Sequence, residues 1–353
     1  MRDFIWSPDG QQLALQIDQN GDEMHQMYLL PARGGWAQPI TNAMEAQHYV
    51  ADWSPDSRTL AYAANDREPT NMDVILHDIA TGDTRRPMPQ GKQMYAISWS
   101  PDGHYLLVLD FHTNTDQDIY ILNVATGEIL HAAPHDGEGV FFPAAWANDS
   151  SGFYLRTSYQ REFLGLAFYS MAAQKWEFVE TPDHDIENVV MSKNGVLVWD
   201  VNDNGASKLH GRDLRSGKDL AIFGMLLCVI GARIGQRDGT RLAITLARPT
   251  EAFNLYEVDL ASGQVQALSQ SMLGGIDPAA RSNRRRCFSP VRWHVDSGGF
   301  CRPRGAGRFP LCSIHGGPEA VERTQYNYNG INICSIVVLA CWRPTFAAQR
   351  ATA

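Results

Sequence analysis

Cysteine is missing from the first 227 residues of this 353-residue sequence, and five of its six cysteines fall within the last 67. The six are Cys228, Cys287, Cys301, Cys312, Cys334 and Cys341. No two of them form a C-x-x-C pair, so the sequence offers no zinc-ribbon or thioredoxin-type site. We expect reduced thiols in a cytoplasmic protein, because disulfide frameworks are typical of short exported chains.

Long apolar runs and basic clusters are also scarce. No stretch approaches the ~18 apolar residues of a membrane helix, and the N-terminal MRDFIWSPDG has no apolar core of a signal peptide. The net charge is −9, with 30 basic and 39 acidic residues, and no basic run precedes Arg281. We therefore expect neither a membrane nor a nucleic-acid partner. A packed core is feasible at 44% hydrophobic residues, and the oligomeric state stays open.

A repeat of about 46 residues organises the first 270 positions. The tetrad Trp-Ser-Pro-Asp occurs three times, a weaker copy follows as Trp-Ala-Asn-Asp, and the steps between copies are 47, 46 and 47 residues. The first and last residues of these four copies are Trp6 and Asp9, Trp53 and Asp56, Trp99 and Asp102, and Trp146 and Asp149. Degenerate copies begin at Met191 and Gly235. A role in structure is the expected one for all of these motifs.

Each repeat carries the pattern of β-strands. An alternating run follows each early tetrad, as in Thr59–Tyr62 and Tyr105–Val108, and a later apolar run ends in a small-residue turn such as Ala80–Gly82 or Ala125–Gly127. Four strands in about 46 residues is the size of a β-propeller blade, and a tryptophan before the turn suits the space between neighbouring sheets. The sequence thus predicts an all-β propeller with about six visible blades. A β-sandwich is the alternative, but it does not account for the constant tryptophan spacing.

Within the predicted propeller, little points to chemistry. None of the eleven histidines has a recognisable metal-ligand spacing, and we expect them at the surface or in loops. The acidic stretch Thr113–Asp118 lacks the glycine and closing glutamate of an EF-hand loop, which favours a solvated turn. We therefore expect neither a metal ion nor a cofactor.

The strongest functional signal lies in residues 302–329, where an apolar run ends in His315-Gly316-Gly317-Pro318. A glycine-rich turn after a strand can offer backbone N–H groups to an oxyanion, because glycine permits close approach. With Trp-Ser-Pro-Asp repeats before it, this segment resembles the prolyl oligopeptidase family of serine peptidases, and most closely its acylaminoacyl-peptidase and dipeptidyl-aminopeptidase branch. The resemblance implies a TolB-like propeller of seven or more blades that gates an α/β-hydrolase domain acting on short peptides or acyl-peptides. By that resemblance, Gly317 and Gly316 would supply the oxyanion hole, while His315 would shape the turn.

The sequence departs from that family in one decisive respect. A G-x-S-x-G motif is absent, and only 24 residues follow Asn329, so we expect this sequence to lack the nucleophile, acid and base that the resemblance implies. A back-translation of Trp342–Thr352 read two bases later gives Ala-Pro-Asn-Val-Arg-Gly-Ser-Thr-Gly-Tyr, which resembles the family sequence after His-Gly-Gly-Pro. We therefore expect a propeller at 1–270, an out-of-frame linker at 271–301, the start of a hydrolase domain at 302–333 and an out-of-frame tail at 334–353.

Two functions remain open from the sequence. The first is a truncated serine peptidase that is inactive as it stands, with no catalytic residues and a peptide as the substrate of the complete family member. The second is a non-enzymatic, TolB-like propeller that binds a peptide or protein partner.

Overall fold

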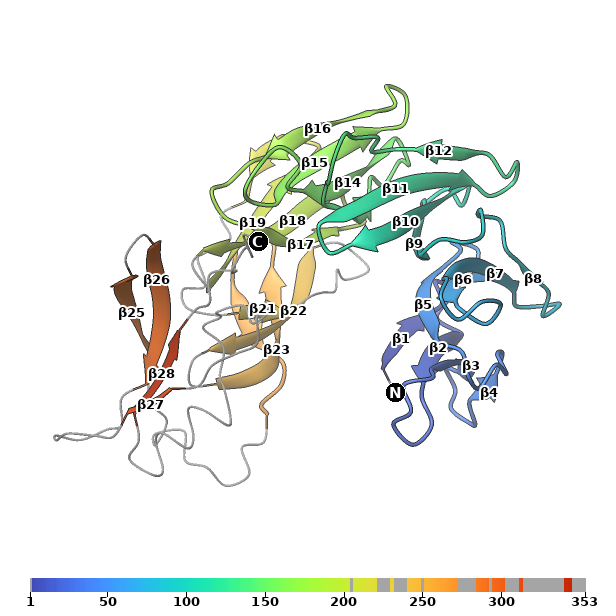
Figure 1. The fold of residues 1–353 in the computed structure, drawn as a ribbon, viewed down its shortest axis with the longest axis horizontal. Coiled ribbons are helices and arrows are strands. Elements are labelled where there is room, and N and C mark those ends of the chain that lie inside the picture. Colours follow the sequence, from blue (N-terminus) through green and yellow to red (C-terminus); the bar gives the residue numbers. More distant parts are fainter. Residues whose placement is uncertain are drawn as a thin grey trace. The chain divides into compact units, whose positions relative to one another are not determined.

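The computed structural model describes residues 2–203, 206–220, 229–231, 240–248, 251–271, 284–291, 294–301, 311–313 and 340–344. The chain divides into two compact units, Met1–Asp183 and His184–Ala353. Every regular element in the described residues is a β-strand (Figure 1). Among these residues there is also no helix with the length and hydropathy needed to cross a membrane.

The second repeat shows how one unit of sequence becomes one blade. Its strands are β5 (His48–Trp53), β6 (Thr59–Ala64), β7 (Asp73–Asp78) and β8 (Thr84–Arg85), paired antiparallel in chain order. The tetrad turn joins β5 to β6, and the Ala80–Gly82 turn joins β7 to β8. Gly82 has a φ of 77°, a left-handed conformation that glycine adopts without strain. The same Asp78 carboxylate accepts hydrogen bonds from the N–H groups of Ala80 and Thr81, which closes the turn.

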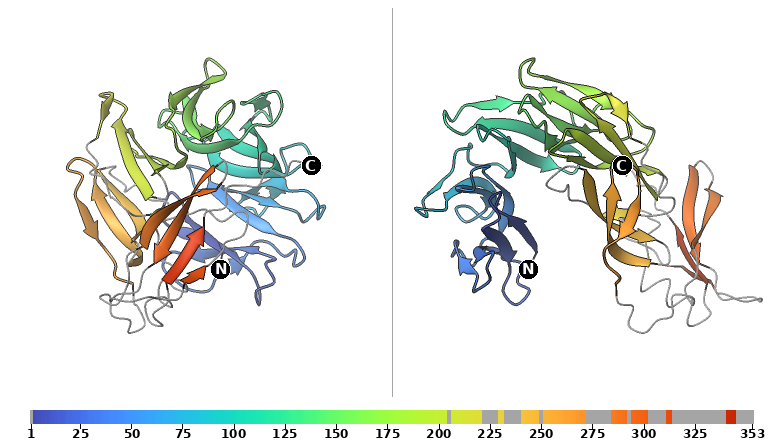
Figure 2. Two further views of the ribbon diagram at one scale, coloured as in Figure 1. Left: turned by 60° about the vertical axis from the view of Figure 1, so that its left-hand side comes forward. Right: turned by 180° about the vertical axis from the view of Figure 1, so that it is seen from behind.

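Three more blades of this form complete the first unit, and Figure 2 shows their strands side by side. The first blade contains β1 (Asp3–Trp6), β2 (Gln12–Ile17), β3 (Gln26–Pro31) and β4 (Gln38–Pro39). The third contains β9 (Met94–Trp99), β10 (Tyr105–Thr113), β11 (Asp116–Asn123) and β12 (Ile129–His131). The fourth contains β13 (Phe141–Trp146), β14 (Gly152–Thr157), β15 (Gly165–Ser170) and β16 (Lys175–Glu180).

The second unit adds two blades and a further sheet. The fifth blade contains β17 (Ile186–Met191), β18 (Val196–Asp203), β19 (Ala206–Asp213) and β20 (Lys218–Asp219). The sixth contains β21 (Val229–Gly231), β22 (Arg241–Arg248), β23 (Glu251–Asp259) and β24 (Val265–Ala267). The prediction of an all-β propeller with six visible four-stranded blades is therefore confirmed.

The further sheet has the strand order β25-β26-β28-β27 and includes one parallel pair, β27 with β28. Its strands are β25 (Arg284–Val291), β26 (His294–Cys301), β27 (Leu311–Ser313) and β28 (Ala340–Pro344). Three of these strands fall in the segments that we expect to be out of frame. The origin of those segments stays a prediction.

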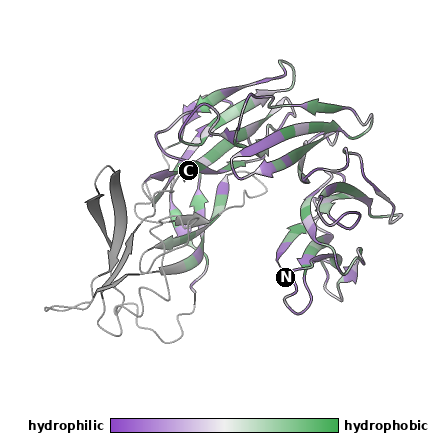
Figure 3. Cartoon of the chain, in the orientation of Figure 1, coloured by the Kyte–Doolittle hydropathy of each residue, from purple (hydrophilic) through white to green (hydrophobic). Residues whose placement is uncertain are grey.

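Hydrophobic clusters lie between consecutive blades, and Figure 3 shows hydrophobic residues concentrated along the strands. Ala14 and Met27 of the first blade pack with Trp53 and Leu60 of the second. Similar clusters join the second blade to the third and the third to the fourth, and another joins the fifth to the sixth. Because each sheet has apolar residues on both faces, every blade needs a neighbour to exclude water.

Candidate functional site

The residues predicted to form an oxyanion hole, His315, Gly316 and Gly317, lie outside the described residues. The described chain nearest to them is β27, which ends at Ser313. Their role therefore stays a prediction from the sequence.

The serine and aspartate of each early tetrad form a compact turn. Ser54 Oγ donates a hydrogen bond to Asp56 Oδ1 over 2.6 Å and accepts one from the N–H of Thr59 over 2.9 Å. The Arg58 N–H also donates to Asp56 Oδ1. The hydroxyl of Ser54 lowers the pKa of Asp56, because its hydrogen bond favours the ionised carboxylate. Equivalent serine–aspartate bonds occur in two other tetrads, between Ser7 and Asp9 and between Ser100 and Asp102.

Serine at the position after the tetrad links the turns of neighbouring blades. The N–H of Asp9 donates to Ser57 Oγ, and the N–H of Asp102 donates to Ser150 Oγ, both over 3.1 Å and both 48 residues apart. In the fourth tetrad, Asp149 accepts bonds from Ser151 within its own turn. The two bonds that Ser57 and Ser150 accept join the tetrad turn of the first blade to that of the second, and the turn of the third blade to that of the fourth.

The tetrad tryptophans lie between blades. The indole N–H of Trp53 donates to the carbonyl of Ile5, and that of Trp146 donates to the carbonyl of Ser98, each over 3.3 Å and into the preceding blade. The exposed fractions are 2% for Trp53, 6% for Trp99, 6% for Trp146 and 50% for Trp6. Trp6 differs because no blade precedes the first one within residues 1–183.

Between the second and third blades, the carboxylate of Asp52 makes the link that the indole N–H of a tetrad tryptophan makes elsewhere. Asp52 Oδ1 accepts a hydrogen bond from the backbone N–H of Trp53 over 2.9 Å, and Asp52 Oδ2 accepts one from the backbone N–H of Trp99 over 3.0 Å. Burial raises the pKa of Asp52 to about 6, although both hydrogen bonds favour the charged form. The indole nitrogen of Trp99 is buried without a hydrogen-bond partner. Asp52 thus joins two blades through one ionisable group.

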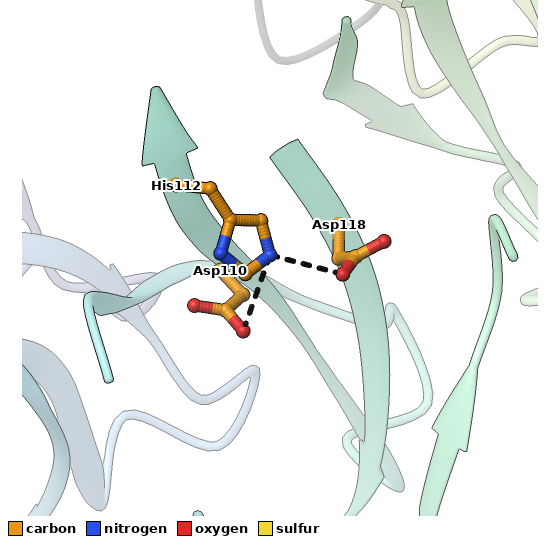
Figure 4. A group of neighbouring side chains, drawn as sticks. All are labelled: Asp110, His112 and Asp118. Atoms are coloured by element: carbon orange, nitrogen blue, oxygen red, sulfur yellow. Dashed lines mark hydrogen bonds and ion pairs between the residues drawn. The ribbon is translucent and has the colours of Figure 1, made fainter. Parts of the chain in front are cut away.

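Among the described residues, one group of three side chains that could bind a metal ion lies near the β10–β11 turn of the third blade. Asp110 and His112 come from β10 and Asp118 from β11, and Figure 4 shows the imidazole between the two carboxylates. His112 Nε2 lies 3.1 Å from Asp118 Oδ2 and 3.7 Å from Asp110 Oδ2. One ligand atom from each residue lies within 4.8 Å of the others, a spacing that can hold a metal ion. Asp110 is 1% exposed, whereas His112 is 38% exposed.

Two further side chains contact the carboxylates of this trio. Lys92 Nζ lies 2.6 Å from Asp110 Oδ2, and this hydrogen bond raises the pKa of Lys92. His131 Nε2 lies 2.8 Å from Asp118 Oδ1. The imidazole of His131 also stacks on the ring of Tyr120, with 4.7 Å between the centroids. The carboxylates of the trio are therefore held by neighbours on two other segments, Lys92 before β9 and His131 on β12.

A second histidine–carboxylate pair adjoins the trio. His135 Nδ1 lies 2.8 Å from the carbonyl of Ala133, and its Nε2 lies 3.0 Å from Asp116 Oδ1. Burial lowers the pKa of His135, but the bonds to Ala133 and Asp116 outweigh burial, so the pKa is raised. The hydrogen bond with His135 in turn lowers the pKa of Asp116.

Two expectations from the sequence are wrong here. The stretch Thr113–Asp118 is not simply a solvated turn, because β11 begins at Asp116, and Asp116 and Asp118 both contact histidines. Histidines are also not confined to the surface and loops, because His25, His48 and His77 are at most 5% exposed. Asp110 is opposite Asp118 only because the β10–β11 register shifts between Phe111 and Thr113; a regular hairpin centred on Asn114-Thr115 would have paired Asp110 with Ile119, so this pairing was not readable from the sequence.

Comparisons with known proteins agree with the architecture. A model of the N-terminal β-propeller domain of prolyl oligopeptidase matches residues 1–271. A solved structure from work on two prolyl endopeptidases and their inter-domain dynamics is 14% identical with a TM-score of 0.81. That alignment covers 97% of this chain and 53% of the other, so this chain spans about half of that protein. No match is found among curated proteins.

Proposed function

Because this chain belongs to the prolyl oligopeptidase family, we propose that its blades are the propeller of a serine peptidase that hydrolyses short peptides or acyl-peptides. The observation that carries this proposal is the family match over residues 1–271, which coincides with the six blades from β1 to β24.

In this proposal the propeller gates access of the substrate to the hydrolase site. A propeller that excludes large substrates must be rigid enough that its opening does not widen. Buried tryptophans and the Asp52 carboxylate join consecutive blades of the first unit, which supports such stiffness.

The 353 residues themselves are proposed to lack acyl-transfer activity. They contain no G-x-S-x-G motif, and Gly316 and Gly317 could at most donate hydrogen bonds to an oxyanion. Without a nucleophile and a base, such donors cannot form or hydrolyse an acyl-enzyme. The same observation favours the second candidate, a propeller that binds a peptide or protein without cleaving it.

Labelling with a fluorophosphonate, together with a series of acyl-peptides of increasing length, tests this part of the proposal. We expect the purified 353-residue chain to show neither labelling nor hydrolysis. Covalent labelling of any serine in this chain, abolished by prior heat denaturation, would show that the nucleophile has been overlooked. Capture of an intact peptide by the unlabelled chain, with no cleavage by mass spectrometry, would favour the binding module.

A further inference from the structure

We propose that Asp110, His112 and Asp118 of the third blade bind a divalent first-row transition-metal ion of the Zn²⁺ type. The site goes beyond the proposed peptidase function and does not depend on it. It uses two carboxylate oxygens and one imidazole nitrogen, which come from two paired strands and lie within 4.8 Å of one another. In Figure 4 the imidazole points to both carboxylates rather than away from them.

The strand geometry brings these donors together. Asp110 on β10 is directly opposite Asp118 on β11, and the register shifts between Phe111 and Thr113, so His112 lies at a β-bulge next to this pair. Two carboxylates opposite each other repel, and this repulsion is stronger where water is scarce. Since Asp110 is 1% exposed and Asp118 is 16% exposed, the pair needs positive charge nearby.

In the metal-free chain Lys92 supplies part of that charge. Its ammonium lies 2.6 Å from Asp110 Oδ2, but the Lys92 side chain is 39% exposed, so it can move into solvent when a metal ion takes its place beside the buried carboxylate. A divalent ion at the trio would neutralise both carboxylates at once. Lys92 is therefore a competitor for the oxygen that the metal would use.

His131 orients Asp118, the carboxylate that contacts His112. His131 Nε2 holds Asp118 Oδ1, which leaves Oδ2 directed to His112. Carboxylate ligands in metal sites are commonly fixed in this way by a hydrogen bond to the oxygen that does not bind the metal.

The mixed donor set favours one class of ion over others. Zn²⁺ and related transition metals accept imidazole nitrogen and carboxylate oxygen in four-coordinate sites with a remaining position for water. Calcium takes six to eight oxygen ligands, which this trio does not offer, and Mg²⁺ retains most of its water. The expected role of the bound ion is to stabilise the turn end of the β10–β11 hairpin by joining the two strands.

Isothermal titration of the full chain with Zn²⁺ tests the proposal, after alkylation of the cysteines to remove thiolate ligands. We expect one saturable site, a rise in thermal unfolding temperature with Zn²⁺, and at least about a tenfold loss of affinity in His112→Gln. Lys92→Met should bind Zn²⁺ more tightly, by roughly fivefold, because a competing cation is removed.

His184→Gln is the matched control. His184 Nε2 lies 3.2 Å from Asp203 Oδ1 and the side chain is 36% exposed, so this pair resembles the His112–Asp118 contact. Within the part of the chain that the structure describes, His184 belongs to no group of three possible metal ligands. Its affinity should equal that of the parent chain. Circular dichroism establishes that each variant is folded.

Absorption of the Co²⁺-loaded chain gives a second readout, since the ligand-field bands report inner-sphere contact. Absence of a Zn²⁺ site in the parent chain would overturn the proposal. Equal affinity in His112→Gln and His184→Gln would do so as well, because the bound ion would then lie elsewhere.

Discussion

Asp52, on strand β5, makes the stability of the first unit depend on pH in a direction opposite to that of Asp56 in the tetrad turn. Its carboxyl has a pKa raised from 3.8 to about 6 by burial between the second and third blades. Below pH 3.8 the group is neutral in both the folded and the unfolded chain, and its contribution to stability is complete. As pH rises through about 6 the buried group ionises, and that contribution is lost.

The magnitude follows from the two pKa values. A difference between 3.8 and about 6 corresponds to at most about 3 kcal/mol in the free energy of unfolding over the whole pH range. Between pH 4.5 and 7.5 about 2 kcal/mol remains, because the unfolded carboxyl is already mostly ionised at pH 4.5. Asp52→Asn stays neutral throughout. The stability of the parent chain minus that of the variant should therefore fall by about 2 kcal/mol across this interval.

Urea unfolding followed by tryptophan fluorescence measures this difference, since Trp53 and Trp99 flank Asp52. Asp56→Asn is the control. The pKa of Asp56 is lowered by Ser54, so its contribution is present above pH 3.8 and is lost only as pH falls further. The Asp56→Asn difference should stay nearly constant between pH 4.5 and 7.5. Parallel pH profiles for Asp52→Asn and the parent chain would refute the reasoning.

Three further substitutions test the blade architecture by urea or thermal unfolding. Trp53→Ala should cost about 3–5 kcal/mol, and Trp6→Ala less than half of that, because their exposed fractions are 2% and 50%; equal losses would contradict the placement of Trp53 between blades. Gly127→Ala should cost about 1–2 kcal/mol from its φ of 76° alone, since nothing lies within 4 Å of the added Cβ; a neutral result would show that the turn relaxes. Ser100→Ala removes a donor to Asp102 and should cost about 1–2 kcal/mol; an unchanged midpoint would show that this turn does not depend on the hydroxyl.

The blades were predictable because their signals are local and repeated. Strands β6 and β10 begin at Thr59 and Tyr105, where the alternating runs begin, and the turns that close β7 and β11 contain Gly82 and Gly127. Because the repeat occurs several times, each weak strand or turn pattern is supported by several copies. The blades could therefore be assigned even where the strand boundaries within one repeat were uncertain.

Single polar residues inside the blades were not predictable in this way. Asp52 is a single acidic residue on strand β5, and the residue that it bonds across the blades, Trp99, is 47 positions away in the sequence. His48 is 1% exposed and packs against the ring of Tyr62, with 5.9 Å between the centroids. Burial at such positions depends on contacts between sheets, which strand periodicity does not specify.

The Asp110, His112 and Asp118 site was within partial reach of sequence reasoning. The three residues lie within nine positions of one hairpin, but the β-bulge that brings Asp110 opposite Asp118 is not specified by strand alternation. The contributions of Lys92 and His131 come from other segments of the blade, and their approach becomes visible only once the sheet is assembled.

Active-site labelling of the protein expressed from its native coding DNA tests the peptidase account most directly. The account predicts a product longer than 353 residues that reads through in a corrected frame after about codons 280 and 334. A fluorophosphonate should label it at one serine within a G-x-S-x-G motif. A native product of the same 353 residues that binds no probe would contradict the account, and so would a label on any serine already present in this sequence.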